Sequence, residues 1–297
     1  MLPNNNFSVI PWYESLVQQN AEKWWIAGKV YPLFVQGAYL VPFQIILPHD
    51  ADRSAINASF TLYRADGTYV GAANITPTLY SFASLGYDVY VWNASSPIRS
   101  SLPVGRYYLK MNDETVIRYS EIFTVLGNTE PYLRINWYDA EDLVMDAGRI
   151  VYQNSFANIL YLKADLAKPQ YLFSEEGEER DGYFYPVKQI SEKRYQFKFW
   201  ASEYLLDVMR FIRLSDYVTV HYRGQTYPVD SFLLTPEWED AGDVASVTVE
   251  FDTATAVKKL GVGYVRSLRG DFNDDYNDDY SNQRGIEPEE ENEDENR

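Results

Sequence analysis

Residues 195–220 read YQFKFWASEYLLDVMRFIRLSDYVTV, a stretch that joins a strand pattern, a helix pattern and a second strand pattern without a break. Tyr195, Phe197 and Phe199 alternate with polar residues, which is the two-residue period of a strand that buries one side. The same alternation is clearest at residues 245–251, which read ASVTVEF. These patterns predict a mainly β chain with a helix inserted in its second half.

The helix is predicted over about residues 202–214. Leu205, Met209 and Ile212 recur at i, i+4 and i+7, so they form one apolar stripe. Ser202 precedes the stripe and can cap the first turn through its hydroxyl. A helix with a single apolar stripe is expected to cover one face or one end of a sheet.

The first half of the chain reads as short strands separated by turns. Asp66 and Gly67 lie between two strand patterns and predict a hairpin, because both residues tolerate the positive φ of a tight turn. Residues 102–109 place a proline and glycine turn before an aromatic strand, which is common in late hairpins of immunoglobulin-like (Ig-like) sandwiches. Short strands at this spacing, without a long helix between them, predict an Ig-like β-sandwich.

The length of 297 residues fits two domains. The predicted fold class is mainly β, an Ig-like β-sandwich followed by a second β-sandwich-type domain with one covering helix. The predicted parts are an aromatic N-terminal arm (1–28), the Ig-like sandwich (29–126), a linker (127–131), a β domain that contains the helix (132–262) and a disordered acidic tail (263–297).

Charge is concentrated at the C-terminus. The chain has a net charge of −17, and residues 271–297 contain twelve acidic and two basic residues, which leaves −7 for the other 270. Such a tail cannot bury enough apolar surface to offset its ordering entropy. The body lacks the basic excess of a nucleic-acid groove, so no nucleic-acid partner is expected.

Cellular location is predicted from what the sequence lacks. It contains no Cys, which excludes disulfides, thiolate chemistry and Cys-based zinc sites. The N-terminal residues lack the basic start and apolar run of a signal peptide, and no stretch approaches the roughly 20 apolar residues of a membrane span. We therefore expect synthesis and retention in the cytoplasm, with no membrane partner.

The N-terminal arm carries the interface candidates Trp12, Trp24 and Trp25. Large aromatic side chains rarely stay fully exposed on a soluble protein. The arm is therefore expected to pack either on its own body or on a neighbouring subunit, and the sequence leaves both possibilities open.

Catalytic motifs are absent from the sequence. The two histidines, His49 and His221, lie outside any nucleophile motif, so no catalytic residue is predicted and the protein is not expected to be an enzyme. The acidic tail begins like a calcium loop at Asp271, but Tyr276 and Asn282 occupy the positions that require Gly and Glu. No metal and no cofactor are expected.

Two alternative functions remain open from the aromatic and acidic residues. Trp137, Trp200 and Trp238 are candidate platforms for stacking on sugar rings in a carbohydrate-binding adhesin module. Glu237 and Glu239 flank the last of these, and paired carboxylates beside aromatic platforms are typical of glycoside hydrolases. The second alternative is therefore a glycoside hydrolase.

The segment at 195–220, followed by GQTYPVDSFLLTPEWEDAGDVASVTVEFDT at 224–253, is similar in texture to β-sandwich tail-tube and distal-tail proteins of bacteriophages. The order of parts also resembles structural proteins of phages that infect Bacteroidetes. The resemblance implies a virion structural protein of a tail, baseplate or connector. It would form a homo-oligomer, bind other virion proteins, and be made in the host cytoplasm before assembly into the virion.

Overall fold

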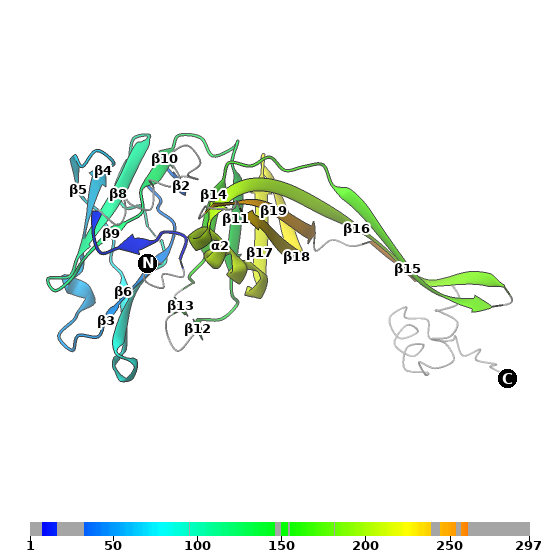
Figure 1. Ribbon diagram of the computed structural model, residues 1–297, viewed down its shortest axis with the longest axis horizontal. Helices are drawn as coiled ribbons and strands as arrows, with labels where there is room; N and C mark the ends of the chain where they lie inside the picture. Colours follow the sequence, from blue (N-terminus) through cyan, green and yellow to red (C-terminus); the bar gives the residue numbers. More distant parts are fainter. Residues whose placement is uncertain are drawn as a thin grey trace, which may run out of the picture. The chain divides into compact units, whose positions relative to one another are not determined.

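The computed structural model describes residues 8–16, 33–94, 96–145, 150–153, 155–180, 182–238, 244–253 and 257–260. These residues are mainly β, as the sequence predicts (Figure 1). They divide into two compact units, one made of Met1–Gln170 with Arg194–Ala254 and the other of Tyr171–Lys193 with Thr255–Arg297. The predicted acidic tail, the calcium-like stretch, Trp24, Trp25 and Glu239 lie outside the described residues.

Two sheets form the first half of the larger unit. The smaller sheet has the order β3-β7-β6, and the larger has the path β1-β9-β8-β10-β2, with β4 also paired to β8 and β5 paired to β4. Strands β2 and β10 are parallel, and the other pairs are antiparallel. The strands are β1 (Trp12–Tyr13), β2 (Leu33–Gln36), β3 (Phe43–Pro48), β4 (Ser59–Arg64), β5 (Tyr69–Ala72), β6 (Thr78–Phe82), β7 (Tyr87–Trp92), β8 (Gly105–Asn112), β9 (Ile117–Ser120) and β10 (Phe123–Leu126); short 3-10 turns are η1 (Ala55–Asn57) and η2 (Ala83–Leu85).

This strand order is that of an Ig-like sandwich. One sheet pairs β3, β7 and β6 as Ig-like folds pair B, E and D, and the other pairs β4, β8 and β10 as they pair C, F and G. The hydroxyl of the buried Tyr107, on β8, donates to the carbonyl of Pro103 at 3.0 Å. A tyrosine near the start of strand F that bonds back to the chain is the tyrosine corner of this fold. The predicted Ig-like sandwich is therefore confirmed.

Aromatic rings hold the two sheets face to face. The centroid of the Trp12 ring lies 4.9 Å from that of Phe43 and 6.0 Å from that of Phe60. Phe43 also contacts Trp92, at 5.3 Å. Because Trp12 and Phe60 belong to the larger sheet and Phe43 and Trp92 to the smaller one, these contacts cross the sandwich.

The second half of the larger unit contributes β14, β11, β17, β18, β19 and residues 194–202 of β16 to a sheet with the order β14-β11-β17-β18-β19-β16-β15; β15, β20 and the rest of β16 belong to the smaller unit, where β20 pairs with β16. In this sheet, Arg223 and Gly224 have φ of 48° and 76° and form the tight turn that joins β17 and β18. The bounds are β11 (Leu133–Tyr138), β12 (Leu143–Met145), β13 (Ile150–Tyr152), β14 (Asn158–Leu162), β15 (Gln170–Arg180), β16 (Tyr183–Ser202), β17 (Tyr217–Tyr222), β18 (Gln225–Trp238), β19 (Val244–Thr253) and β20 (Val257–Leu260); β12 and β13 pair separately.

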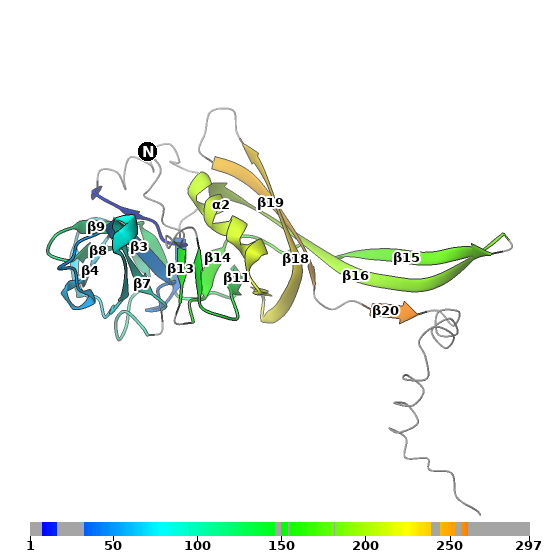
Figure 2. The same cartoon turned by 90° about the horizontal axis from the view of Figure 1, so that it is seen from below.

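The predicted helix forms as α2 (Glu203–Met209), which continues into the 3-10 turn η4 (Arg210–Leu214). It lies across the sheet of the second half (Figure 2). Its buried side chains are Leu205, Leu206, Val208, Met209, Phe211 and Ile212. The apolar stripe is therefore the surface that covers the sheet. Of the helices in the described ranges, none is long and apolar enough to cross a membrane.

Strands β3 and β7 are buried on both sides, whereas the edge strand β6 is partly exposed. Phe43 and Tyr90 face the larger sheet of the sandwich, whereas Val89 and Val91 join a cluster with residues 150–152, Phe156 and Phe211. Gln44 is fully buried beside them, and its side-chain oxygen accepts from the backbone N–H of Val151 at 3.0 Å. The predicted linker at 127–131 lies between β10 and β11. Contacts of β2 with β14 and of β7 with β13 join the two halves that it connects.

The position of Trp12 predicts a large loss of stability on truncation. Trp12 is 1% exposed, so Trp12→Ala leaves a cavity between the two sheets. We expect the free energy of unfolding, measured by urea denaturation, to fall by about 3–5 kcal/mol. Trp238→Ala removes the same side chain from an exposed position and is expected to cost less than about 1 kcal/mol. Equal losses in the two variants would contradict the burial of Trp12.

Candidate interaction surface

The smaller unit contains a β-ribbon, defined here as β15, the 183–193 part of β16, and β20. Side-chain contacts align its two long strands: the amide of Gln189 donates to Glu175 at 2.6 Å, and Lys188 lies 3.6 Å from Glu176. Backbone pairing joins β20 to the other edge of β16. The ribbon is therefore three strands wide where β20 is present.

The ribbon exposes large aromatic side chains. Tyr171 is 72% exposed and Phe173 is 64% exposed. They are two residues apart on β15, so both lie on the same side of the strand. Only a cation–π contact from Lys193, 5.7 Å from the ring centroid, is found over Tyr171 among the described residues. Exposed aromatic pairs of this kind mark interaction sites more often than solvated surface.

Acidic residues occupy the rest of β15. Glu175, Glu176, Glu178 and Glu179 are all exposed, and Gly182 has a φ of 76° in the turn that follows. This run lacks apolar residues, so it gains little from burial and stays at the surface. Glu175 and Glu179 are on the same side of β15 as the two exposed aromatic residues, since all four have odd positions along the strand.

A buried charge cluster lies elsewhere, in the Ig-like sandwich. The Arg53 guanidinium lies 2.7 Å from the Asp88 carboxylate and 2.8 Å from that of Asp113, and all three side chains are buried. Burial alone would raise the pKa of Asp88, but hydrogen bonds from His49, Ser81, the Asp50 N–H and Arg53 hold it below its ordinary value. The cluster ties the turn after β3 to β7 and to the end of β8.

His49, Ser81 and Asp88 have the residue types of a catalytic triad, which the sequence did not reveal. In a triad the carboxylate and the hydroxyl bond to opposite nitrogens of the imidazole. Here Asp88 lies 2.9 Å and Ser81 3.3 Å from the same atom, His49 Nδ1. Ser81 also donates directly to Asp88, at 2.7 Å. The imidazole is not placed to take the serine proton. His49 and Ser81 instead hydrogen-bond the Asp88 carboxylate and so stabilise the charge cluster.

The second histidine has a local structural role. His221 lies on β17, with Nε2 3.1 Å from the hydroxyl of Thr219 and Nδ1 2.8 Å from that of Thr226. Burial lowers the pKa of His221, and the positive charge of Arg134 lowers it further. A neutral imidazole between two hydroxyl groups strengthens the pairing of β17 with β18.

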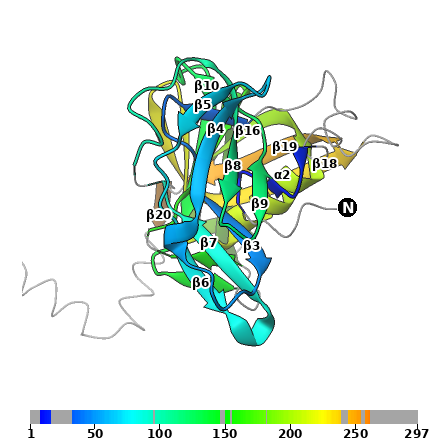
Figure 3. The same cartoon turned by 90° about the vertical axis from the view of Figure 1, so that its left-hand side faces the viewer.

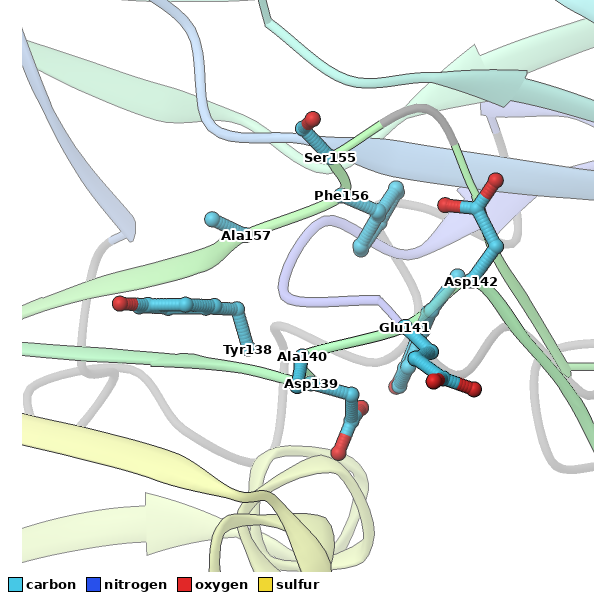
Figure 4. A pocket seen from close by; sticks show the side chains of 9 residues that line it. Tyr138, Asp139, Ala140, Glu141, Asp142, Ser155, Phe156 and Ala157 are labelled. Carbon is cyan, nitrogen blue, oxygen red and sulfur yellow. The ribbon is translucent and has the colours of Figure 1, made fainter.

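A pocket of about 330 Å³ lies beside the end of β11. Asp139, Glu141 and Asp142 line it together with Tyr152 and Phe156, whose rings stack at 4.9 Å. Figure 4 shows the three carboxylates pointing in different directions rather than toward one point. Within the described ranges, no group of three or more His, Asp or Glu could hold a metal ion. The pocket therefore lacks the convergence of a metal or catalytic site.

Burial raises the pKa of Asp139, and the neighbouring carboxylate of Asp216 adds to the rise. Hydrogen bonds from backbone N–H groups also reach both carboxylates. The N–H of Asp216 donates to Asp139 at 3.3 Å, and the N–H of Ala140 donates to Asp216 at 2.9 Å. These bonds fix the loop that follows β11, which accounts for the position of Asp139 without a ligand.

The three tryptophans predicted as sugar platforms do not form one surface. Trp137 is 0% exposed, so its ring lies in the core and cannot stack on a ligand; that prediction is wrong because β11 is a central strand with this side buried. Trp200 and Trp238 are 40% and 48% exposed. Trp200 pairs with Ser246, whereas Trp238 pairs with the adjacent Ala245, so the two rings lie on opposite faces of the sheet.

The structure describes one of the three interface candidates, Trp12. Trp12 is buried within its own chain, so at this position the arm packs on its own body. Trp24 and Trp25 lie outside the described residues. The sequence analysis missed Tyr171 and Phe173 as interface residues; their only signal was two aromatic residues at strand spacing beside an acidic run.

Comparisons with known proteins do not show a family for this chain. No protein-family model matches the chain, and no curated protein matches it. Among solved structures, the crystal structure of Dpr2 Ig1-Ig2 in complex with DIP-Theta Ig1-Ig3 is similar at 11% identity, over 78% of this chain and 94% of that chain. The TM-score is 0.14, so this likeness carries no argument.

The charge cluster predicts a stability that depends on pH. Because the folded pKa of Asp88 is below its ordinary value of 3.8, its contribution is present above that value and is lost as the pH falls through the folded pKa. Asp88→Asn is expected to lower the free energy of unfolding by about 3 kcal/mol at pH 7, because Arg53 loses a buried partner. The difference from the parent should therefore shrink as the pH falls below 3.8.

Urea denaturation at several pH values measures this difference. Asp230→Asn, at an exposed position of β18, is the control and should leave stability nearly unchanged at each pH. A loss in Asp88→Asn that is the same at pH 7 and pH 3 would contradict an ionic role for this carboxylate.

Proposed function

We propose that the protein is a structural interaction protein that works through protein–protein contacts, with the ribbon as its binding element. The observation that carries the proposal is the exposed pair Tyr171 and Phe173 on β15. Aromatic residues dominate the binding energy of protein interfaces when partners bury them. A strand that presents two of them beside charged residues has the composition of an interface, with an apolar centre and a polar rim.

Among the described residues, the polar side chains that lie together do not converge as those of a catalytic site would. This also favours an interaction function over catalysis. His49 meets Ser81 and Asp88 in a geometry that stabilises the fold, and the carboxylates of the pocket point apart (Figure 4). Trp200 and Trp238 lie on opposite faces of the sheet, which weakens the adhesin alternative because they cannot stack on the same sugar chain.

The place of this protein in a phage tail, baseplate or connector rests on the resemblance of residues 195–220 and 224–253 to tail-tube and distal-tail proteins. Such proteins assemble from many copies, and an exposed ribbon suits that role. The partners would be further copies of this chain and other virion proteins.

Replacing the aromatic pair tests the proposed function. Tyr171→Ser with Phe173→Ser should raise the concentration at which the protein assembles by about tenfold or more, because two buried aromatic anchors are lost. Sedimentation velocity over a concentration series measures this shift. The melting temperature should hardly change, since both side chains are exposed in the single chain.

The matched control is Tyr138→Ser with Tyr217→Ser, which removes another exposed aromatic pair whose rings stack at 5.0 Å. This control should assemble like the parent. Assembly that is equally weakened in both double variants would count against the ribbon, and a parent that neither self-associates nor binds another virion protein would refute the proposed function.

A further inference from the structure

A second aromatic surface lies on the Ig-like sandwich, on the side of its larger sheet that faces away from the core. Tyr63 is directly opposite Tyr108 and Tyr69, and its ring stacks on that of Tyr108 at 5.3 Å. Tyr119 continues the row, 6.4 Å from Tyr108. Figure 3 shows β5, β4, β8 and β9 side by side toward the viewer. We call this surface the tyrosine face; it comprises Tyr63, Tyr69, Tyr108, Tyr119, Arg106 and Lys110.

The tyrosine face carries positive charge. Arg106 and Lys110 alternate with the core residues of β8, so both lie on the same side as Tyr108. Their cross-strand neighbours are Thr124, Thr61 and Tyr119, none of which is acidic. Within the described part of the chain, neither cation forms an ion pair. The carboxylate of Asp66 also lies near Tyr108, with Arg64 close to it, so the charge around the rings stays positive. Two cations beside a row of phenol rings make a surface suited to an acidic, aromatic partner.

The ribbon has the complementary chemistry. One side of β15 presents Tyr171 and Phe173 followed by Glu175 and Glu179, all exposed. The aromatic rings can stack on the exposed Tyr69 and the half-buried Tyr63, since Tyr108 itself is buried. The carboxylates can pair with Arg106 and Lys110. Pairing one ribbon with the ribbon of another copy would instead oppose one glutamate run to another, which is destabilising.

We propose that the ribbon of one copy docks on the tyrosine face of a second copy. The inference rests on the proposed function, because it names the partner of the same ribbon. Since the two surfaces are different parts of the chain, the contact is head-to-tail: each copy offers one ribbon and one face. Repetition of such a contact closes a ring or extends a filament, according to the rotation between copies.

Complementation between two variants tests the head-to-tail contact. The ribbon variant carries Tyr171→Ser and Phe173→Ser, and the face variant carries Arg106→Glu and Lys110→Glu. Each alone should remain monomeric at concentrations where the parent assembles. An equimolar mixture should form a species of two chains and nothing larger, because the intact ribbon of the face variant meets the intact face of the ribbon variant.

A charge exchange adds a test of pairing. Glu175→Lys and Glu179→Lys, introduced into the face variant, should restore assembly to within about tenfold of the parent, because each side then carries the opposite charge. Assembly of the parent should weaken as salt is raised, since the pairs are at the surface. The matched control reverses two exposed lysines elsewhere, Lys163→Glu and Lys168→Glu, and should assemble like the parent.

The outcomes separate this inference from the proposed function. If the parent and the control assemble but the mixture stays monomeric, or if the face variant assembles normally, then the ribbon binds elsewhere and the inference fails while the proposed function stands. If the parent neither assembles nor binds another virion protein, both fail. A two-chain species formed by the mixture alone, with melting temperatures near that of the parent, supports the head-to-tail contact.

Discussion

The larger unit depends on two paired strands, β3 and β7, that are buried on both faces. Phe43, Tyr90 and Trp92 pack into the Ig-like sandwich, whereas Val89, Val91 and Gln44 contact the second half. A strand with two buried sides must be apolar throughout, and β7 is buried from Asp88 to Trp92. Its one acid, Asp88, is tolerated because Arg53, His49 and Ser81 surround the carboxylate. The two halves therefore share a core, so destabilising these strands is expected to affect both.

Residues that repeat with a clear period were predictable, and residues brought together by topology were not. Three local patterns predicted elements that the structure contains. They are the alternation at 245–251, the apolar stripe at 202–214 and the Asp66-Gly67 turn. By contrast, β16 extends through residues 188–193, where the sequence shows no alternation because both sides of the ribbon meet solvent. The meeting of His49 with Asp88 and Ser81 depends on pairing between strands far apart in sequence.

The sequence did not predict the position of the candidate site. Composition indicated a protein that works by aromatic contact, yet all the tryptophans chosen from sequence that the structure describes are buried or lie on opposite faces. Burial of an aromatic residue depends on which side of a sheet it occupies, and a one-residue shift reverses that side. Tyr171 and Phe173 are exposed because β15 is the last strand of its sheet and carries a run of glutamates that cannot be buried.

The length of β16 also has a mechanical meaning. A single strand of 20 residues runs from the ribbon into the larger unit, where nine of its residues pair with β19. Within the larger unit, the hydrogen bonds of this ladder run perpendicular to the two strands, so a force applied along residues 194–202 would load them together instead of opening them one after another. This part of β16 would therefore resist tension along the chain in the strongest direction of its own sheet.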